Sequence, residues 1–250
     1  MRILAFRLWG DFAHFRRHYT TSSPLTHSLP PPSALRGLVA AILGVSRRDY
    51  PEVFSPGKCR FGVRLLRPVK KIRLGLNYMD TKDGSWVELD LKRFRPVVKK
   101  DTQGGLRFHT QVRVEFLKAP AFEIYFVHED RTVFEELSAR LRERRVVFTP
   151  YLGITECLAN FEFLWEEDLE PSSGSFRIVS AFKSTDLINL HLEDGAGLIK
   201  EPLPLFIDQE RKRHATVEAV FDPRGRLIRA KLSEAFLYPG KTDEVFSFLG

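Results

Sequence analysis

The chain has 250 residues, of which 43% are hydrophobic and 28% charged, so it has room for one large globular domain or two small ones. No apolar run approaches the roughly 20 residues that a membrane span needs, and the first residues are typical of a strand rather than a signal peptide. Cys59 and Cys157 lie far apart and form no metal spacing with histidine, so we expect a reduced, cytoplasmic protein without a disulfide framework.

Charge divides the chain into two parts. Residues 1–150 carry 28 Lys and Arg against 15 Asp and Glu, a net charge of +13, whereas residues 151–250 carry 11 against 17, a net charge of −6. The basic part suits a polyanion such as nucleic acid. The acidic part either avoids the nucleic acid or meets a basic protein surface. The alternative is a chance excess of charge on solvated faces.

The hydrophobic pattern predicts an α+β fold for residues 1–170. Strands are expected at residues 2–9, 60–69, 121–128 and 156–165, and helices at residues 33–43 and 133–144. A capping box formed by Thr132 and Glu135 opens the second helix. The order βαββαβ is that of the ferredoxin-like unit that RNA-recognition (RRM-like) domains share.

The first helix carries its own start and stop signals. Three prolines precede it, Ser33 is the expected N-cap and Gly44 the expected residue just beyond its end. Arg36 lies in the first turn, where a cation opposes the helix dipole, so an anion such as a phosphate is expected at this open N-terminus. The alternative is a buried helix with one solvated arginine.

A long insertion, about residues 71–118, separates the second and third strands. From Leu106 to Phe116 the even positions are mostly apolar and the odd positions polar, which predicts a strand with one wet face. The glycines at 104 and 105 mark a turn before it. We expect a β-rich projection.

Residues 171–250 are expected to form a small antiparallel β subdomain. Its predicted strands are 176–182, 186–192, 215–221 and 227–237. Residues 222–225, Asp-Pro-Arg-Gly, predict a hairpin turn between the last two. The charged run from Asp208 to Arg213 is expected to be a solvated loop.

Three segments resemble one known family. They are PPPSALRGLVAAILG at residues 30–44, VRVEFLKAPAFEIYFVHED at 112–130 and FTPYLGITECLANFEF at 148–163. With the first strand ending at Trp9-Gly10 and the basic loop after it, they resemble the CRISPR-associated Cas-five family of the RAMP superfamily. The resemblance covers residues 1–165 and is loose from Ser175 onward.

The resemblance implies a subunit of a type I Cascade complex, perhaps of subtype I-B. Such subunits carry a β thumb and bind the 5′ handle of the guide crRNA without cutting it. They contact the repeated backbone subunit and the large subunit, and meet target DNA only indirectly. No cofactor or membrane is implied. Two alternatives stay open: a metal-independent endoribonuclease that processes precursor crRNA, and a protein scaffold in the same complex.

The loop after the first strand is the first candidate for RNA contact. Cations and hydroxyls bind phosphates, and aromatic rings stack on unpaired bases. The candidate residues here are Arg16, Arg17, His18, Tyr19 and Thr20, followed by Ser33 and Arg36 of the first helix. The alternative is a solvated loop.

The tip of the insertion is the second candidate for RNA contact. A turn at the glycines brings Lys99 and Lys100 opposite Arg107 and His109, which makes a cationic patch. The alternative is an edge strand that its charges protect from pairing.

The sequence predicts no metal site and no matched catalytic set. None of the seven histidines belongs to an H-E-x-x-H or C-x-x-C spacing. A metal-independent ribonuclease needs a general base, a general acid and a cation near the scissile phosphate. His18, Tyr19, Lys100 and His109 are the residues that supply these in the endoribonuclease alternative.

Overall fold

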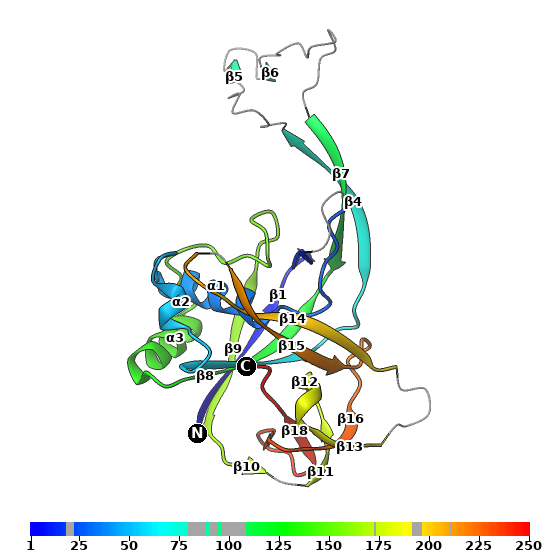
Figure 1. Ribbon diagram of the computed structural model, residues 1–250. Helices are drawn as coiled ribbons and strands as arrows, with labels where there is room; N and C mark the ends of the chain where they lie inside the picture. The colour runs from blue at the N-terminus through cyan, green and yellow to red at the C-terminus, as the bar shows by residue number, and fades with distance from the viewer. Residues whose placement is uncertain are drawn as a thin grey trace.

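The computed structural model describes residues 1–18, 23–79, 89–90, 95–96, 109–172, 174–191, 197–210 and 212–250. In these ranges the protein is a mixed α/β fold, mostly sheet with few helices (Figure 1). No helix in the described ranges is long and apolar enough to cross a bilayer.

A four-stranded antiparallel sheet forms the centre of the molecule. Its strands, in spatial order, are β3 (Cys59–Leu65), β8 (Ala121–His128), β1 (Arg2–Trp9) and β9 (Asn160–Asp168). Alternate residues of β1 face opposite sides, so Leu4 and Phe6 join one core and Ile3 and Ala5 another. The helices α1 (Pro32–Leu43) and α3 (Arg131–Glu143) pack on the first side, and the short α2 (Tyr50–Val53) follows α1. The strands predicted at 2–9 and 121–128 are confirmed.

Both helices begin differently from the prediction. Pro31, not Ser33, is the N-cap of α1, and no side chain caps it, whereas Gly44 ends the helix at φ 80° as expected. The Asp130 carboxylate accepts from the backbone N–H of Thr132, so the predicted capping box is wrong. Glu135 instead pairs with Arg131 one turn earlier.

The other side of the central sheet is covered by the C-terminal strands. A six-stranded sheet follows the order β10 (Pro171–Ser172), β17 (Ala235–Leu237), β18 (Glu244–Phe246), β11 (Ser175–Ile178), β16 (Ile228–Leu232) and β13 (Leu187–His191). The Phe246 ring stacks on Tyr125 of β8 with 4.0 Å between centroids. The backbone of Leu249 donates to Phe61 at the edge of β3.

A three-stranded sheet lies beside α1. Its order is β12 (Phe182–Lys183), β15 (Arg213–Phe221) and β14 (Ile199–Ile207), and the 3-10 turn η2 (Ser184–Asp186) follows β12. The predicted turn at 222–225 forms, but β15 and β16 lie in different sheets, so the predicted hairpin is wrong. The largest core joins Leu203 and Phe221 to β1, and the division of the chain at residue 170 stays a prediction.

Two strands project from the body as an antiparallel pair (Figure 1). They are β4 (Lys71–Met79) and β7 (His109–Lys118), which we call the projecting hairpin, and β2 (Phe12–Ala13) pairs with β7 at its base. The strand predicted at 106–116 is thus observed two to three residues later, and β4 was not predicted. The short strands β5 (Leu89–Asp90) and β6 (Arg95–Pro96) pair with each other.

Candidate nucleic-acid interface

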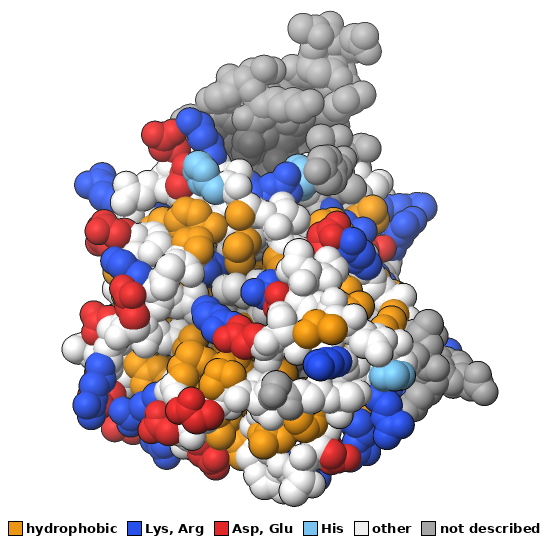
Figure 2. All heavy atoms as spheres, turned by 60° about the horizontal axis from the view of Figure 1, so that its bottom comes forward, with side chains coloured by type: hydrophobic (Ala, Val, Ile, Leu, Met, Phe, Trp, Pro, Cys, Tyr) orange, Lys and Arg blue, Asp and Glu red, His pale blue; other side chains and the backbone are white. Residues whose placement is uncertain are grey.

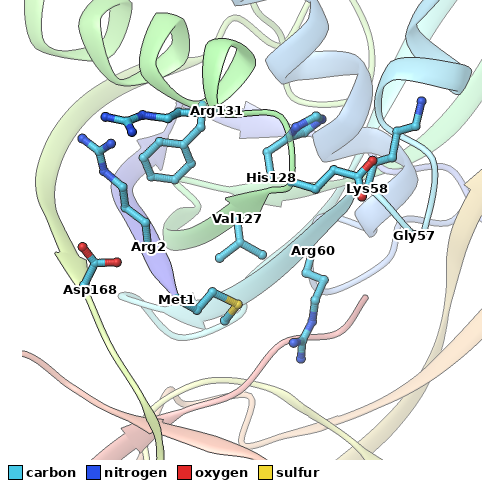
Figure 3. Close-up of a pocket in the computed structure, with 11 residues that line it drawn as sticks. Met1, Arg2, Gly57, Lys58, Arg60, Val127, His128, Arg131 and Asp168 are labelled. Atoms are coloured by element: carbon cyan, nitrogen blue, oxygen red, sulfur yellow. The ribbon is translucent and has the colours of Figure 1, made fainter.

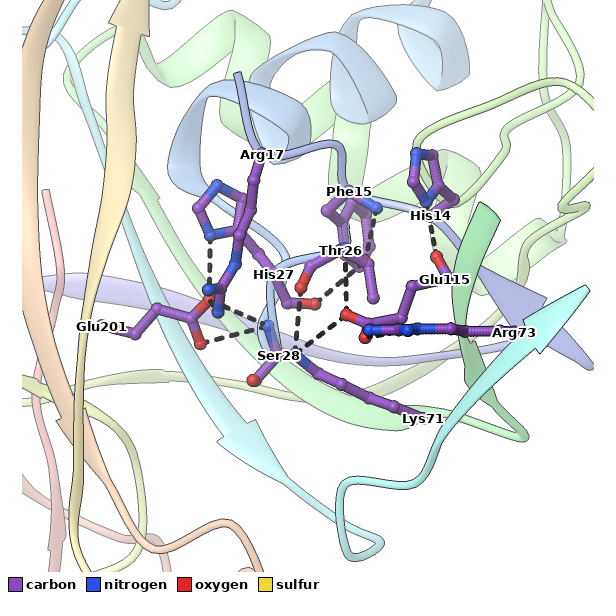
Figure 4. Close-up of polar contacts among 10 residues, drawn as sticks. All are labelled: His14, Phe15, Arg17, Thr26, His27, Ser28, Lys71, Arg73, Glu115 and Glu201. Carbon is purple, nitrogen blue, oxygen red and sulfur yellow. Dashed lines mark hydrogen bonds and ion pairs between the residues drawn. The ribbon is translucent and has the colours of Figure 1, made fainter. Parts of the chain in front are cut away.

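The loop after β2 is held at the base of the projecting hairpin by Glu115 of β7 (Figure 4). We call residues 14–28 the anchored loop, of which 19–22 lie outside the described residues. His14 donates through Nδ1 to the Glu115 carbonyl at 2.7 Å, and the Thr26 N–H donates to the Glu115 carboxylate at 3.2 Å. Lys71 of β4 donates to the Thr26 carbonyl at 3.0 Å. The loop therefore joins both strands of the hairpin.

Glu201 of β14 holds the other side of the anchored loop. Glu201 is 2% exposed, and its carboxylate pairs with the Arg17 guanidinium. It also accepts from His27 Nδ1 at 3.0 Å and from the Ser28 N–H at 3.2 Å. Burial alone raises the pKa of Glu201, but the hydrogen bond from His27 and the Arg17 charge outweigh it and lower the pKa to about 2.

Residues 150–153, Pro-Tyr-Leu-Gly, which we call the Pro-x-Leu-Gly segment, support the anchored loop through their backbone. The His14 N–H donates to the Leu152 carbonyl at 3.0 Å. Gly153 has φ +95°, and a Cβ there would lie 2.7 Å from the His14 carbonyl carbon. Only glycine fits this approach, which explains the residue type at position 153.

Three arginines and one histidine from three segments lie near these anchors. We call Arg16, His18, Arg73 and Arg213 the basic cluster. His18 accepts through Nδ1 from the Arg213 guanidinium at 2.9 Å, and desolvation together with the Arg213 charge lowers the pKa of His18. Arg16 forms a β-bridge with Thr26, whose neighbour Glu115 lies 4.0 Å from Arg73. Arg73 has a side-chain exposure of 67%.

The structure places the other predicted RNA-contact residues in different ways. Arg17 pairs with the buried Glu201 carboxylate and keeps 36% of its side chain exposed. Tyr19, Thr20, Lys99, Lys100 and Arg107 lie outside the described residues, and His109 is described only as the first backbone position of β7. Of the four residues in the endoribonuclease alternative, only His18 has a described side chain.

The predicted anion site at the start of α1 is wrong. Residues 26–32 are all buried, so the first turn of the helix is not open to a phosphate, and Ser33 is half-buried within it. Arg36 is 1% exposed, donates through Nε to the Phe54 carbonyl at 2.6 Å and also binds the Leu205 carbonyl. Burial lowers the pKa of Arg36. This guanidinium joins α1 to α2 and β14 and does not reach a ligand.

Sequence reasoning missed Glu115, Glu201 and Arg213. The alternation of residues predicts Glu115 on the wet face of its strand, and the charged run predicts Arg213 in a solvated loop. Their partners in the anchored loop are 89 to 195 positions away in the sequence, so no local pattern reveals these contacts. The sequence offers only a chemical indication: a basic loop is expected to pair with a carboxylate, but the sequence does not identify which one.

A cavity of about 580 Å³ lies elsewhere, at the start of β1 and of α3 (Figure 3). Val127 and Phe134 line it, together with several charged side chains. Arg2 and Arg131 point to one side of it, and both pair with Glu135, whereas Arg60 points away and pairs with Glu234. These three arginines pair with carboxylates, and Glu129 and Asp168 also line the cavity, so its lining carries both signs of charge.

The face opposite the projecting hairpin also mixes both signs of charge. Figure 2 shows Lys, Arg, Asp and Glu side chains interspersed there, with hydrophobic side chains between them. Among the described residues, no group of His, Cys, Asp and Glu side chains is arranged to hold a metal ion. The candidate interface is therefore placed at the basic cluster, whose members come from the anchored loop, β4 and β15.

One family model and several solved structures match this chain. The family described as CRISPR-associated protein (Cas_Cas5) matches residues 3–234. A chain of a structure described as a CRISPR RNA-guided surveillance complex is 15% identical, with 92% of this chain and 90% of that chain covered and a TM-score of 0.52. A CRISPR protein from Archaeoglobus fulgidus is 16% identical, with 98% and 97% covered and a TM-score of 0.52. No protein with a curated description matches. Since the family match spans nearly the whole sequence, the chain belongs to the CRISPR-associated Cas5 family.

Proposed function

We propose that this chain is a non-catalytic RNA-binding subunit of a type I Cascade complex and that it holds the 5′ handle of the guide RNA. Membership of the Cas5 family supports a role in CRISPR defence. One structure with the same fold comes from a CRISPR RNA-guided surveillance complex. Subtype I-B, on the resemblance above, is part of the proposal.

We infer a ferredoxin-like layout for the central sheet. The order β3-β8-β1-β9 places the first strand beside the third and the fourth, with α1 and α3 on one side, and this supports the inference. In this layout β1 ends at Trp9, and the anchored loop and the projecting hairpin leave the sheet at that end. RNA bound there meets both.

The basic cluster carries the proposal. Arg16, Arg73 and Arg213 come from three separate segments, and the Glu115 and Glu201 anchors hold the first of them in place. Guanidinium groups bind phosphates through paired N–H donors, so a surface of this kind suits a single-stranded nucleic acid backbone. Tyr19, Thr20 and the Lys99, Lys100, Arg107 and His109 group are further proposed contacts.

The acidic second part of the chain is proposed to meet protein rather than RNA. Residues 151–250 carry a net charge of −6. The partners we propose are the backbone subunit and the large subunit, with target DNA reached only through the assembled complex. The cell compartment proposed for it is the cytoplasm.

Copurified RNA tests the RNA-binding role. The wild-type chain is expressed with the rest of its CRISPR operon, and the RNA that copurifies is sequenced. We expect one RNA population whose 5′ ends share the repeat-derived handle. The isolated chain is also tested for binding of handle RNA. A chain that enters the complex but binds no handle RNA when isolated would be a protein scaffold instead.

A separate assay tests the endoribonuclease alternative. The isolated chain is incubated with its cognate precursor repeat RNA, once with Mg²⁺ and once with a chelator, and we expect no specific cut. A cut that is lost in His109→Ala or Tyr19→Phe would overturn the non-catalytic role.

A further inference from the structure

Trp9, the last residue of β1, lies on the side of the central sheet that faces away from α1 and α3. Alternate residues of β1 face opposite sides, and Ala5, on the same side as Trp9, belongs to the core beneath the C-terminal strands. Trp9 itself is half-buried and belongs to none of the hydrophobic cores found among the described residues. The sheet therefore ends in a large aromatic ring that no core encloses.

The indole ring of Trp9 packs against a cation and against no other ring. The guanidinium carbon of Arg7 lies 5.0 Å from its centroid, which is within the range of a cation–π contact. Within the described ranges no aromatic ring stacks on the indole and no acceptor takes its N–H. A tryptophan that is enclosed by its own protein usually finds an acceptor for this N–H. The ring of Trp9 is thus held on one side and is without a partner of its own kind.

The charges around Arg7 favour a base over a phosphate as the ligand of this ring. In the strand registers Arg7 lies between Glu123 of β8 and Glu162 of β9, although it forms no ion pair with a described residue. The two carboxylates pair with other arginines, Glu123 with Arg64 and Glu162 with Arg144. Carboxylates repel a phosphate, whereas they accept hydrogen bonds from the exocyclic amino groups of bases.

The position of Trp9 in the sheet is one at which RNA-recognition domains stack bases. Such domains use a four-stranded sheet, and aromatic side chains on its open face stack two or three bases. Here β1 is a middle strand in the order β3-β8-β1-β9. The C-terminal strands cover part of the same face, where the Phe246 ring stacks on Tyr125. Trp9 is the aromatic residue that β1 presents beyond this cover.

The end of β1 lies at the base of the projecting hairpin (Figure 1). The Gly10 N–H donates to the carbonyl of Pro120, two residues after β7, at 3.3 Å. Trp9 and His14, the first residue of the anchored loop, are five residues apart, a span of at most about 18 Å. RNA that is held at the anchored loop therefore has Trp9 within reach.

We propose that Trp9 is a stacking site for one unpaired base of the RNA that this chain binds, and that Arg7 holds the indole ring in place. The ligand is a nucleobase of single-stranded RNA. This inference rests on the proposed function, because it takes the guide RNA as the ligand. It adds a contact with a base, whereas the arginines of the basic cluster are proposed to bind the phosphates.

Tryptophan fluorescence tests the stacking directly. Every chain carries Trp86→Phe, which leaves Trp9 and Trp165 as the two indoles. The isolated chain is titrated with an RNA of the handle sequence read from the copurified guide, and we expect quenching, because a base stacked on an indole lowers its emission. Quenching should disappear in Trp9→Phe. It should persist in the matched control Trp165→Phe, because Trp165 packs against the core rings of Tyr125 and Phe246.

Handle RNAs with a single abasic nucleotide, placed at each position in turn, identify the base. We expect one position to abolish the quenching while the others keep it, since a single ring stacks on a single base. The melting temperature of each variant shows that it is folded.

Affinity for the handle RNA gives a second readout. Trp9→Ala should bind it roughly five- to hundredfold more weakly, the usual effect of removing a ring that stacks on a base. Trp9→Phe keeps a ring and should lose less. The slope of log K against log salt should stay that of the wild type, because no phosphate contact is removed. Ile188→Ala is the control, because Ile188 of β13 is 59% exposed and far from β1 in the sequence, and it should bind like the wild type.

Three results would overturn the inference while leaving the proposed function intact. The handle RNA binds the wild-type chain without quenching it; or Trp9→Phe is quenched as strongly as the wild type; or Trp9→Ala binds the RNA as tightly as the wild type at the same salt. A wild-type chain that binds no handle RNA contradicts the proposed function itself, and the inference with it.

Discussion

His27 donates through Nδ1 to the buried carboxylate of Glu201, across 174 positions of sequence and 3.0 Å of space. Both residues are at most 5% exposed, and Arg17 pairs with the same carboxylate. This contact ties the anchored loop, in the basic part of the chain, to β14, in the acidic part. The basic and acidic parts of the sequence are therefore joined inside the fold by the contacts of Glu201 with His27 and Arg17.

Glu201→Gln should destabilise the protein in a pH-dependent way. The pKa of Glu201 is lowered from 4.5 to about 2, so the charged carboxylate stabilises the fold fully above about pH 5. That contribution, about 3 kcal/mol, is lost as the pH falls from 4.5 towards 2. Urea unfolding of the wild type and the variant at pH 7, 5 and 3.5 measures it. We expect the difference in unfolding free energy to shrink at pH 3.5.

Glu156→Gln is the control for this series, because Glu156 is exposed and its carboxylate accepts only from the neighbouring Thr155 hydroxyl among the side-chain contacts described. Its unfolding free energy should stay close to that of the wild type at each pH. A Glu201→Gln difference that is the same at pH 7 and pH 3.5 would show that the carboxylate is not held in its charged form.

Gly153→Ala should weaken RNA binding by displacing the anchored loop. The new Cβ would clash with the His14 carbonyl group at a residue with φ +95°. We expect affinity for handle RNA to fall about tenfold, as for a loss of roughly 1.4 kcal/mol. Fluorescence anisotropy with a labelled handle RNA measures it.

Gly37→Ala provides the matched substitution. Gly37 lies within α1, and a Cβ there has nothing within 4 Å. It should raise the stability by about 0.5–1 kcal/mol and leave RNA affinity unchanged. Equal RNA affinities for the two variants would argue against a role of the Pro-x-Leu-Gly segment in placing the loop.

Several features of the fold were predictable because they are local. The apolar runs at residues 2–9 and 121–128 predict the bounds of β1 and β8, and Gly44 predicts the end of α1. The strand β14 was missed because it contains Pro202 and Pro204, which argue against a strand. They are tolerated because β14 lies at the edge of its sheet and pairs only with β15. Alternation of Ile72, Leu74 and Leu76 was a readable signal for β4.

The candidate site was only half predictable, for a related reason. The sequence shows that the loop is basic, but not which of its cations face solvent. Arg17 pairs with Glu201, and Arg36 donates to the carbonyls of Phe54 and Leu205; Glu201 and Leu205 lie more than 160 positions away from these arginines. Long-range contacts of this kind leave no periodic pattern.

Arg16→Ala and Arg213→Ala should each reduce the salt dependence of RNA binding. Each phosphate contact contributes a slope of about −0.7 to log K against log salt for a single strand, because a neutralised phosphate releases counterions. Each variant should lose about one such contact and so about 0.7 of the slope. RNA titrations between about 50 and 300 mM KCl measure the slope. Arg131→Ala, at a site 81% exposed on α3, should keep the wild-type slope.

Arg36 should matter for folding and not for RNA. Arg36→Ala leaves the Phe54 and Leu205 carbonyls without their donor and opens a cavity, at a cost of about 2–4 kcal/mol. Arg36→Met keeps most of the volume and should cost less. Chemical denaturation measures both. A folded Arg36→Met variant with a shallower salt slope would contradict the structural role.

Crosslinking maps the guide RNA on the protein most directly. The assembled complex, with its natural guide, is irradiated with ultraviolet light, and the crosslinked peptides and nucleotides are identified by mass spectrometry. We expect the handle nucleotides at the 5′ end to crosslink to peptides that contain residues 14–28 and the Arg73 and Arg213 regions. Handle crosslinks confined to the other subunits, or to the face opposite the projecting hairpin, would contradict the proposed binding of the handle by this chain.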